Sequence, residues 1–578
     1  MEYILNFIAE HYKLLLFLLI LLAFFALFVY DRYVQRKNQI LINFPIIGHM
    51  RHFFYLLRDP MRQYFGDEKF YKSHDQIAWV EKASENKTLF SAFSPSKYDS
   101  RGKFLFKHAN TAYNNDEVSP DFSVVFGDDK KYPFKTKSII GRSAMSDGSI
   151  SPEGTQAFAM GAYMAKFPIN TGEGGLTSNF LRSQNCTDDE TKNRYMDIKK
   201  GTKLSKAVYY VVKFFFNAEL AKKTYRRLII DNIDEVETYS FDNKKLQFFR
   251  IDWDQPLEYF PEDVPHDLPD IIFQMGSGLY GVRDAEGNFN YEKYKKIMRF
   301  SKMTEIKLAQ GAKQTGGKLL ASKVTPAVAY YRGIEPYKDV ISPNRFPYAT
   351  STSDLFDYVG TLQEASEKPV GIKIVISGKE NFVPIADELK KRIDEGKPYP
   401  DFITIDGGDG GSATAPLEMM TKVGIPIQSA LYIVQKKLET LGIRDKVKII
   451  ASEKVLTPDD VLLLKCLGAD FISIARGFMI SAGCIRAREC SGANGRDCPV
   501  GLATQNKKKR ASFLTRQKSH SVANYHNNLI KGVTSLLAIM GLNNVKQANK
   551  SNLTYMKNNK IYFEVDEYFE EKLHTKII

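Results

Sequence analysis

From about Ser138 onward, short apolar runs alternate with longer amphipathic stretches. Eight runs rich in β-branched or apolar residues end in or near Gly or Ser and predict buried strands: 137–146, 166–172, 270–277, 304–311, 370–378, 401–408, 447–453 and 470–477. Amphipathic stretches between them predict helices, for example 153–166, 384–396 and 458–469. About eight βα units favour an α/β fold of the (β/α)8 TIM barrel type over an open doubly wound sheet.

One apolar run near the N-terminus differs from these strands. Residues 14–30 are seventeen uncharged apolar residues, which is at the short end of a membrane span. Tyr12 and Tyr30 supply aromatic residues for the two interfaces. A cleaved signal peptide is the alternative, but no small-x-small cleavage pattern follows the run. We therefore expect residues 1–37 to form a single-pass transmembrane anchor.

The charges on either side of this run predict its orientation. Arg32, Arg36 and Lys37 follow it, whereas Lys13 and two glutamates precede it. The positive-inside rule then places the large domain in the cytoplasm. Thiols stay reduced in that compartment, so clustered cysteines are expected to be metal ligands and not disulfides.

The rest of the chain divides by composition. Residues 38–135 have no clean period and are expected to be an N-terminal elaboration of the barrel domain, which we expect to span 136–520. A segment of about 183–262 interrupts the rhythm between the second and third strands, and 521–578 form a polar, helical C-terminal tail. One large domain with appendages is the minimum organisation for 578 residues.

The insertion is basic and aromatic. Between Lys192 and Arg227 it holds eleven Lys or Arg against two acidic residues, interleaved with the run AVYYVVKFFF. It is either a solvated subdomain with a small core of its own or a face that lies on the membrane near the anchor. The net charge of +14 suits a negatively charged membrane better than nucleic acid, because no nucleic-acid-binding signature accompanies it.

Unusual residues follow the predicted strands, where barrels carry their function. Four glycines surround Asp409 and would let the backbone approach an anion or a flavin edge, although a tight turn needs such glycines too. Arg476 follows the last strand and would contact a phosphate or pair with a surface carboxylate. Lys373 lies in an apolar strand and must either extend its ammonium to solvent or meet a partner or ligand, because an unpaired buried ammonium is costly.

Further cations suggest a dicarboxylate substrate. Lys307 lies in a strand, and Lys313 and Arg332 follow it. Such cations would grip two carboxylates by bidentate and point-charge contacts, although isolated cations are more often surface charge. Histidine is absent from 267–519, which is most of the predicted barrel. A hydroxy-acid oxidase that uses a histidine base is therefore excluded from our expectation.

Three of the five cysteines lie within fifteen residues, at Cys484, Cys490 and Cys498, and Pro-Val-Gly follows the third. We expect the stretch from Cys484 to begin a short helical segment beyond the loop at Arg476.

Seven stretches occur in the order found in the FMN-binding synthase domain of glutamate synthase: SAMSDGSIS, NTGEGG, EIKLAQGAK, VTPAVAYYRG, GIKIVIS, IDGGDGGSATAP and GCIRAREC…CPVGLATQ. The chain resembles the short, anchored proteins of the FMN-binding glutamate synthase family, which carry that domain alone. The resemblance runs from about Phe44 to Arg516, apart from the insertion.

This resemblance implies a TIM-barrel oxidoreductase with FMN and a 3Fe-4S cluster. It implies reductive amination of 2-oxoglutarate through 2-iminoglutarate, with a hydride delivered by the flavin. Ammonia or another amine donor would supply nitrogen. Electrons would come from a separate donor such as ferredoxin or a reductase, since no NAD(P)H-binding fingerprint is present.

The family motifs also imply site residues. FMN contacts would fall on Met145, Ser146, Gln274, Lys373, Asp409, Gly410, Gly411, Lys454 and Arg476. Substrate contacts would fall on Glu173, Lys313 and Arg332, and the cluster would be held by Cys484, Cys490 and Cys498.

The chain departs from the family pattern at several places. No glutamine amidotransferase domain with an N-terminal cysteine is present, so glutamine hydrolysis is not expected. Lys318 replaces a Gln, Phe346 and Pro347 replace a His pair, and Asp147 replaces a Phe. A related flavoenzyme on another oxo acid or imine, and a membrane-tethered electron-transfer module without turnover, therefore stay as alternatives. The family places four residues between the second and third cysteines; here there are seven, in a Gly- and Asn-rich loop that can bulge.

Overall fold

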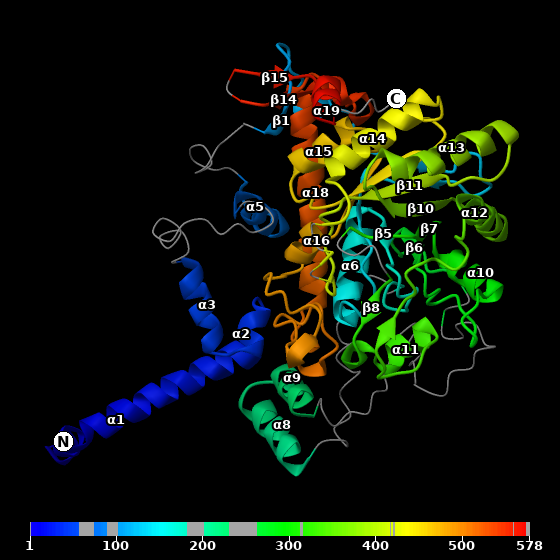
Figure 1. Ribbon diagram of the computed structural model, residues 1–578. Helices are drawn as coiled ribbons and strands as arrows, with labels where there is room; N and C mark the ends of the chain where they lie inside the picture. The colour runs from blue at the N-terminus through cyan, green and yellow to red at the C-terminus, as the bar shows by residue number, and fades with distance from the viewer. Residues whose placement is uncertain are drawn as a thin grey trace.

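Eight parallel strands close into a barrel (Figure 1). In the order of the chain they are β4 (Ile140–Arg142), β5 (Ile169–Asn170), β6 (Ile271–Met275), β7 (Met303–Lys307), β10 (Val370–Val375), β11 (Phe402–Asp406), β12 (Lys448–Ser452) and β13 (Phe471–Ile474). Each pairs with its neighbour in sequence, and β13 closes on β4. All eight strands coincide with the predicted runs, so the predicted TIM barrel is confirmed.

The structure is a computed structural model, and it describes residues 2–56, 74–89, 102–181, 202–229, 260, 263–311, 316–416, 418–419, 422–558 and 560–573.

Helices between the strands cover the outside of the barrel (Figure 1). They are α6 (Pro152–Ala165), α10 (Tyr291–Phe300), α11 (Pro326–Arg332), α12 (Thr352–Ser366), α13 (Lys379–Glu395), α14 (Ile427–Thr440), α15 (Pro458–Cys466) and α16 (Arg476–Ser481). Ser151 begins α6 as an N-cap, because its hydroxyl accepts a hydrogen bond from the Gly154 amide at 3.1 Å. The helix expected from Pro384 begins earlier, at Lys379, and contains that proline.

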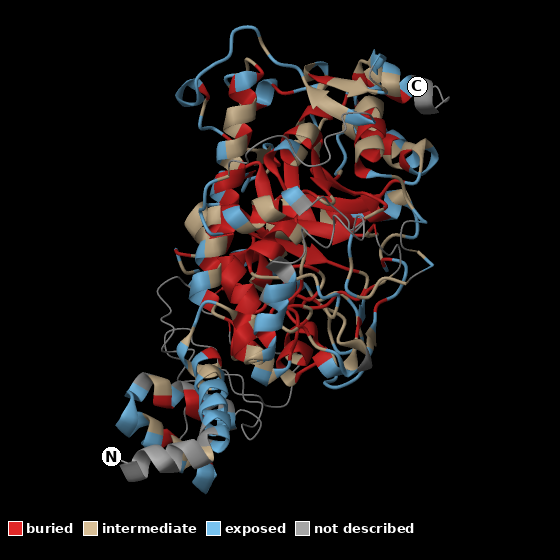
Figure 2. Ribbon diagram, turned by 90° about the vertical axis from the view of Figure 1, so that its left-hand side faces the viewer, coloured by how far each residue is buried: buried red, intermediate tan, exposed pale blue. Residues whose placement is uncertain are grey.

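The amino end of the barrel is filled by aromatic side chains. A hairpin of β2 (Val125–Phe126) and β3 (Phe134–Lys135) brings Phe126 beneath the strands, with its ring 5.5 Å from Phe402 and 6.0 Å from Phe471. Ile272, Met303 and Ile450 belong to the same buried cluster. Figure 2 shows the barrel strands as the most completely buried part of the fold. This end is a packed plug, so a ligand has to enter at the carboxyl ends of the strands.

Segments from both ends of the chain pack against the barrel. The long helix α18 (Thr515–Ile539) lies against α6, and α5 (His74–Ser84) lies against α18. The strand β1 (Lys103–Phe106) pairs with β14 (Leu553–Met556) beside β15 (Tyr562–Phe563) and α19 (Val565–Leu573). The tail boundary expected after residue 520 therefore falls inside α18, a helix whose buried side chains make it part of the barrel's packing.

Two further groups of helices lie at the opposite end from β14 and β15 (Figure 1). The helix α1 (Glu2–Val29) continues into a π-helical turn at Tyr30–Val34, and α2 (Gln39–Asn43) and α3 (Ile47–Leu56) follow. One helix in the described ranges, with the window Leu16–Val34, is long and apolar enough to cross a membrane. Between β5 and β6 stand α8 (Lys203–Phe215) and α9 (Ala218–Ile229), where the sequence predicts an insertion.

Candidate active site

A buried carboxylate organises the middle of the barrel. Glu305 on β7 accepts hydrogen bonds from Asn170 at 2.8 Å and from Gln274 at 2.6 Å through Oε1, and from the Thr404 hydroxyl through Oε2. The four residues come from β5, β6, β7 and β11. Sequence reasoning predicted a role for Gln274 but missed Glu305, although a charged residue inside an apolar strand is the signal that drew attention to Lys373.

A second charged pair lies beside this network. The Nζ atom of Lys373 on β10 is 3.4 Å from Oδ2 of Asp406 on β11, and both side chains are buried. Burial acts to lower the pKa of Lys373, but the carboxylates of Asp406 and Glu305 outweigh it, and the pKa is raised. The barrel interior therefore carries a fixed positive charge, held by two carboxylates.

Glycines bring two loops into contact above the strands. The Gly311 amide donates to Oδ2 of Asp406 at 3.1 Å, and the Gln310 side chain donates to the Gly411 carbonyl at 2.6 Å. A Cβ atom on Gly311 would lie 1.8 Å from the Gly407 carbonyl oxygen and 2.7 Å from the Gly410 nitrogen. Only glycine fits at this crossing.

The predicted cofactor residues that follow the last strands lie beside these loops, on the rim formed by the carboxyl ends of the barrel strands. Lys454 forms an ion pair with Asp409 at 2.9 Å. A Cβ atom on Gly411 would lie 3.0 Å from a terminal nitrogen of Arg476, so this guanidinium faces the Gly-rich turn. Arg476 begins a helix of six residues. The structure thus brings Asp409, Gly410, Gly411, Lys454 and Arg476 together around one turn.

Glu453 is a second site carboxylate that sequence reasoning missed. It lies next to Lys454, is nearly fully buried, and its Oε2 atom has no hydrogen-bond partner among the described residues. Burial raises its pKa to about 8, and the nearby charges of Asp406 and Asp409 act in the same direction. Glu453 is therefore largely protonated at neutral pH.

A small hollow opens beside this rim. Its lining includes Ser146, Ser149, Glu173, Lys318, Arg332 and Ser342. The Lys307 ammonium donates a hydrogen bond of 2.9 Å to Oε2 of Glu173 and one of 3.0 Å to Oε1 of Gln310. A Cβ atom on Gly317 would lie 2.2 Å from Oε1 of Glu173, so a larger residue there would displace this carboxylate.

Arg332 supplies the cation of the hollow. It ends α11, is buried, and a terminal nitrogen lies 3.4 Å from both the Ser146 hydroxyl and the Asp147 carbonyl. Its guanidinium lies over the Tyr280 ring at 5.4 Å, and its Nε atom has no hydrogen-bond partner in the described part of the chain. Burial lowers the pKa of this arginine. A buried guanidinium with donors to spare is suited to an anionic ligand.

Two other predicted site residues are Met145 and Lys313. Met145 lies on the loop after β4, where its carbonyl accepts a hydrogen bond from the buried Arg142 side chain at 3.2 Å. Lys313 lies outside the described residues.

Three residues that differ from the family pattern have different surroundings in the structure. Asp147 is buried and accepts hydrogen bonds of 2.6 Å from both Thr177 and Asn179, so it ties two loops together. Phe346 is buried too, with its ring 5.7 Å from Tyr358, and therefore belongs to the core. Lys318 is exposed and lines the hollow.

The three clustered cysteines lie on one loop after α16. The expectation of a helical segment from Cys484 is wrong, because α16 ends at Ser481 and the loop contains only a short turn at Ala493–Gly495 in the lengthened gap. The pKa of the Cys490 thiol is raised to about 11, chiefly by burial and further by the charges of Cys484 and Cys498, so the three thiols lie near one another.

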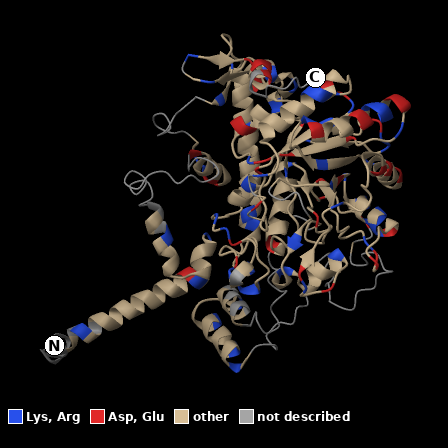
Figure 3. Cartoon of the chain, in the orientation of Figure 1, with Lys and Arg blue, Asp and Glu red and all other residues tan. Residues whose placement is uncertain are grey.

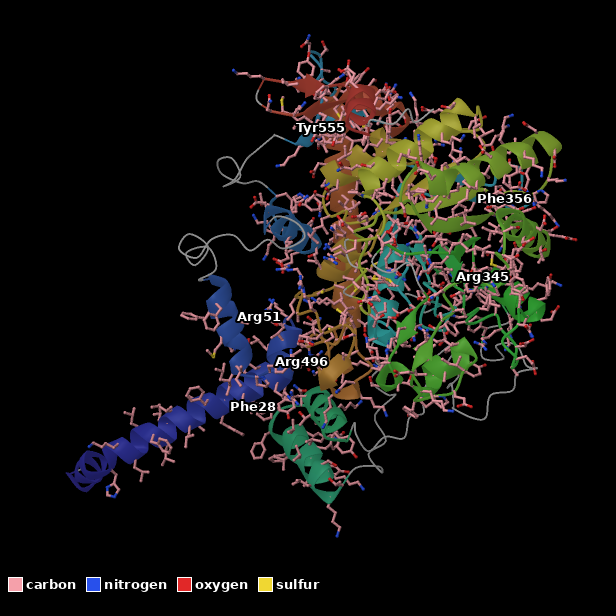
Figure 4. The ribbon with its side chains drawn as sticks, in the orientation of Figure 1. Phe28, Arg51, Arg345, Phe356, Arg496 and Tyr555 are labelled. Carbon is pink, nitrogen blue, oxygen red and sulfur yellow. The ribbon has the colours of Figure 1, made fainter. Side chains whose placement is uncertain are left out.

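The surroundings of this loop connect it to the rest of the site. The buried Lys323 ammonium donates to the carbonyls of Ser149 and Ala503, both at 3.0 Å, and to the carbonyl of Cys490. On its other side the Pro499 carbonyl accepts a hydrogen bond of 2.7 Å from Asn43 in α2. Arg496 in the lengthened gap lies toward α2 (Figure 4). The loop therefore lies between the hollow and the helices that follow α1.

Comparison with known proteins places this site in context. A family model described as the conserved region in glutamate synthase matches residues 97–543. The glutamate synthase large subunit-like protein YerD of Bacillus subtilis is 40% identical over 299 residues, which cover 51% of this chain and 56% of the relative. The archaeal-type NADPH glutamate synthase of Thermotoga maritima is 30% identical over 289 residues, which cover 50% and 53%. The chain spans about half the length of these curated relatives.

Among solved structures, the flavin-binding domain of baker's yeast flavocytochrome b2 matches with 11% identity and a TM-score of 0.41, over 93% of this chain and 95% of that one.

Proposed function

The chain belongs to the family defined by the conserved region in glutamate synthase, and on this premise we propose that it is an FMN- and iron–sulfur-dependent oxidoreductase. Its reaction is the reductive amination of 2-oxoglutarate to glutamate by way of 2-iminoglutarate. The observation that carries the proposal is the hollow lined by Glu173 and Arg332. Lys307 and Gln310 link Glu173 to the Gly411 carbonyl of the Gly-rich turn.

The chemistry of the rim fits FMN. The residues that would hold it are Lys373 and Gln274 inside the barrel and Gly410, Gly411 and Arg476 on the rim. Arg476 would contact the phosphate, and the raised pKa of Lys373 keeps its ammonium charged for a contact with the flavin. When bound, FMN supplies the hydride chemistry.

The side chains that line the hollow are chemically suited to a substrate that carries both a carboxylate and an imine. Arg332 would bind a carboxylate by charge-assisted hydrogen bonds, helped by the Ser146 hydroxyl. Glu173 is oriented by Lys307 at 2.9 Å and would accept the N–H of the imine. In the overall reaction, ammonia condenses with the ketone and releases water, and the resulting C=N bond then gains a hydride and a proton. A separate donor, a ferredoxin or a reductase, supplies the two electrons.

The cysteine loop is suited to an iron–sulfur cluster, because such clusters are held by cysteine thiolates and three thiols lie near one another on this loop. Cys484, Cys490 and Cys498 would hold such a cluster, whose chemistry is electron transfer, and the extra residues form the turn at Ala493–Gly495.

The apolar helix α1 supports a membrane location. We infer a single-pass anchor at residues 1–37, with the catalytic domain on the cytoplasmic side because Arg32, Arg36 and Lys37 follow the apolar run. Resistance of the full chain to alkaline carbonate extraction from membranes tests the anchor, and release into the soluble fraction would overturn it.

One experiment tests the catalytic proposal. The full chain is purified anaerobically in detergent, its flavin, iron and sulfide contents are measured, and 2-oxoglutarate and ammonia are added with a chemically reduced electron donor. We expect one flavin, iron with acid-labile sulfide, and glutamate as product. Protein that folds but contains no flavin would overturn the proposal.

A second substrate class is favoured by one observation. Lys318 replaces a family Gln in the lining of the hollow and adds a positive charge. The alternative is therefore a related flavoenzyme that acts on a different, more anionic oxo acid or imine. A panel of oxo acids in the same assay decides between the two substrate classes. Turnover of another oxo acid, with none of 2-oxoglutarate, favours the alternative.

A further inference from the structure

The helices α8 and α9 form a hairpin with a core of its own. Tyr209, Ala221 and Tyr225 are buried between the two helices, and the two tyrosine rings lie 5.6 Å apart. The Thr202 hydroxyl caps α8 by accepting a hydrogen bond from the Ser205 amide at 3.2 Å. The Asn217 side chain caps α9 by accepting a hydrogen bond from the Leu220 amide at 2.7 Å. The faces turned away from this core are therefore not needed to hold the hairpin together.

The outward face of α8 is apolar. Leu204, Ala207, Val211 and Phe215 follow one another at spacings of three and four residues, which places them on one face of the helix. Leu204 is 75% exposed and Phe215 71%. Phe214, which is 83% exposed, and Phe216 extend the patch to the tip of the hairpin. A contiguous exposed apolar face of this kind marks an interaction surface.

The charge of the hairpin narrows the choice of partner. Residues 202–229 contain seven Lys or Arg and a single acidic residue, Glu219. Figure 3 shows basic residues on the hairpin, whereas α1 beside it is almost free of charge. A basic helix with an exposed aromatic and aliphatic face is the pattern of a helix that lies in a membrane interface. Each Lys or Arg near an anionic lipid surface adds electrostatic attraction to it.

The position of the hairpin agrees with this partner. The helix α9 packs against the turn Tyr30–Val34, which ends the candidate span Leu16–Val34. Phe28, near that end of α1, lies next to the hairpin (Figure 4). The hairpin therefore lies at the level where α1 would leave a bilayer, and Figure 1 shows α11 and β8 (Lys318–Leu319) of the hollow at the same end of the molecule.

We propose that the α8–α9 hairpin is a second membrane contact, which lies in the headgroup region of an anionic bilayer with Phe214, Phe215 and Phe216 at the acyl boundary. This inference rests on the proposed anchoring by α1 and is independent of the catalytic proposal. It assigns the α8–α9 hairpin the task of fixing the orientation of the barrel above the membrane, with the end that carries the hollow facing the lipid surface.

The test uses tryptophan fluorescence of the full chain in vesicles of mixed anionic and zwitterionic lipid. In the variant Phe215→Trp, emission is compared with that of the parent chain, which has the same two native tryptophans. We expect the added emission to be blue-shifted and largely quenched by lipids brominated near the headgroup end of the acyl chain. The matched control is Tyr562→Trp, at a position that is 64% exposed at the far end of the molecule. Its emission should stay that of a tryptophan in water.

Charge reversal provides the second measurement. In Phe215→Trp carrying Lys206→Glu, Lys213→Glu and Lys222→Glu, quenching should fall, while far-ultraviolet circular dichroism shows that helix content is kept. Co-flotation with vesicles separates the two proposals. If the Phe215→Trp variant floats with the vesicles but its added emission is not quenched, the hairpin contact is overturned and the anchor is left intact. Chain that does not float overturns both. A blue shift without lipid quenching indicates a protein partner or a second copy on this face and also overturns the proposal.

Discussion

The ammonium of Lys373 lies 3.4 Å from the carboxylate of Asp406, on adjacent strands inside the barrel. The charge of Glu305 also raises the pKa of Lys373. The Glu305 oxygens accept hydrogen bonds from Asn170, Gln274 and Thr404. Removing one partner of a buried ion pair leaves the other charge without compensation. The positive charge of Lys373 is thus held by buried carboxylates inside the barrel, and we propose that it also contacts the flavin.

Lys373→Met is expected to lose most of the bound flavin and to destabilise the domain by about 3–5 kcal/mol, because Asp406 is left buried without its cation. Flavin absorbance per protein and the temperature of unfolding measure the two effects. Lys302→Met is the control, since Lys302 is half exposed and lies 3.9 Å from Asp270 on the outside. Equal flavin content in the two variants would contradict the role given to Lys373.

Arg332→Lys tests the substrate contact separately from the flavin. Lysine keeps the charge but cannot reproduce a forked contact, so we expect KM for 2-oxoglutarate to rise about tenfold, which corresponds to about 1.4 kcal/mol. Flavin content should stay unchanged. Arg345→Lys is the control, because Arg345 is exposed and is not among the residues that line the hollow. If kcat falls and KM does not, Arg332 does not bind the ground-state substrate.

Glu453 predicts a pH dependence of stability. Its pKa is raised from the usual 4.5 to about 8, so the folded protein holds this proton more tightly than the unfolded chain. The stabilisation is complete below pH 4.5 and is lost as the pH rises through 8, by up to about 1.4 kcal/mol per pH unit between the two values.

Glu453→Gln should remove this slope and raise the unfolding temperature at pH 9 relative to the parent chain. Glu364→Gln, at an exposed position of α12, serves as the control and should follow the parent at every pH. Parallel curves for the parent chain and Glu453→Gln from pH 6 to 9 would show that Glu453 titrates normally.

The strands were predictable because each is a continuous apolar run bounded by turn residues, as expected for strands covered on both faces. The plug was not, since Phe126 and Phe134 lie in two-residue strands whose importance comes only from their contact with Phe402 and Phe471. The same limit explains Glu305, whose role depends on partners from three other strands. Phe346 was noted only as a replacement for a family His, and three-dimensional packing places its side chain in the aromatic core.

Lys323 gives the last prediction, because it joins three parts of the site. Its ammonium donates to backbone carbonyls of the loop after β4, of the cysteine loop at Cys490 and of the segment at Ala503. In Lys323→Met these three carbonyls lose their donor, so we expect a loss of stability of about 1–3 kcal/mol. In protein prepared without iron, the Cys490 thiol should also react faster with a thiol reagent, since its loop is no longer held.

The control for this prediction is Lys338→Met, whose side chain is exposed and paired with Glu335. Both variants remove one positive charge, so a shared effect would reflect net charge, whereas an effect limited to Lys323→Met reflects the three hydrogen bonds. Unchanged thiol reactivity together with an unchanged unfolding temperature would show that the cysteine loop is held by other contacts. The candidate for that role is the hydrogen bond from Asn43 to the Pro499 carbonyl, at 2.7 Å.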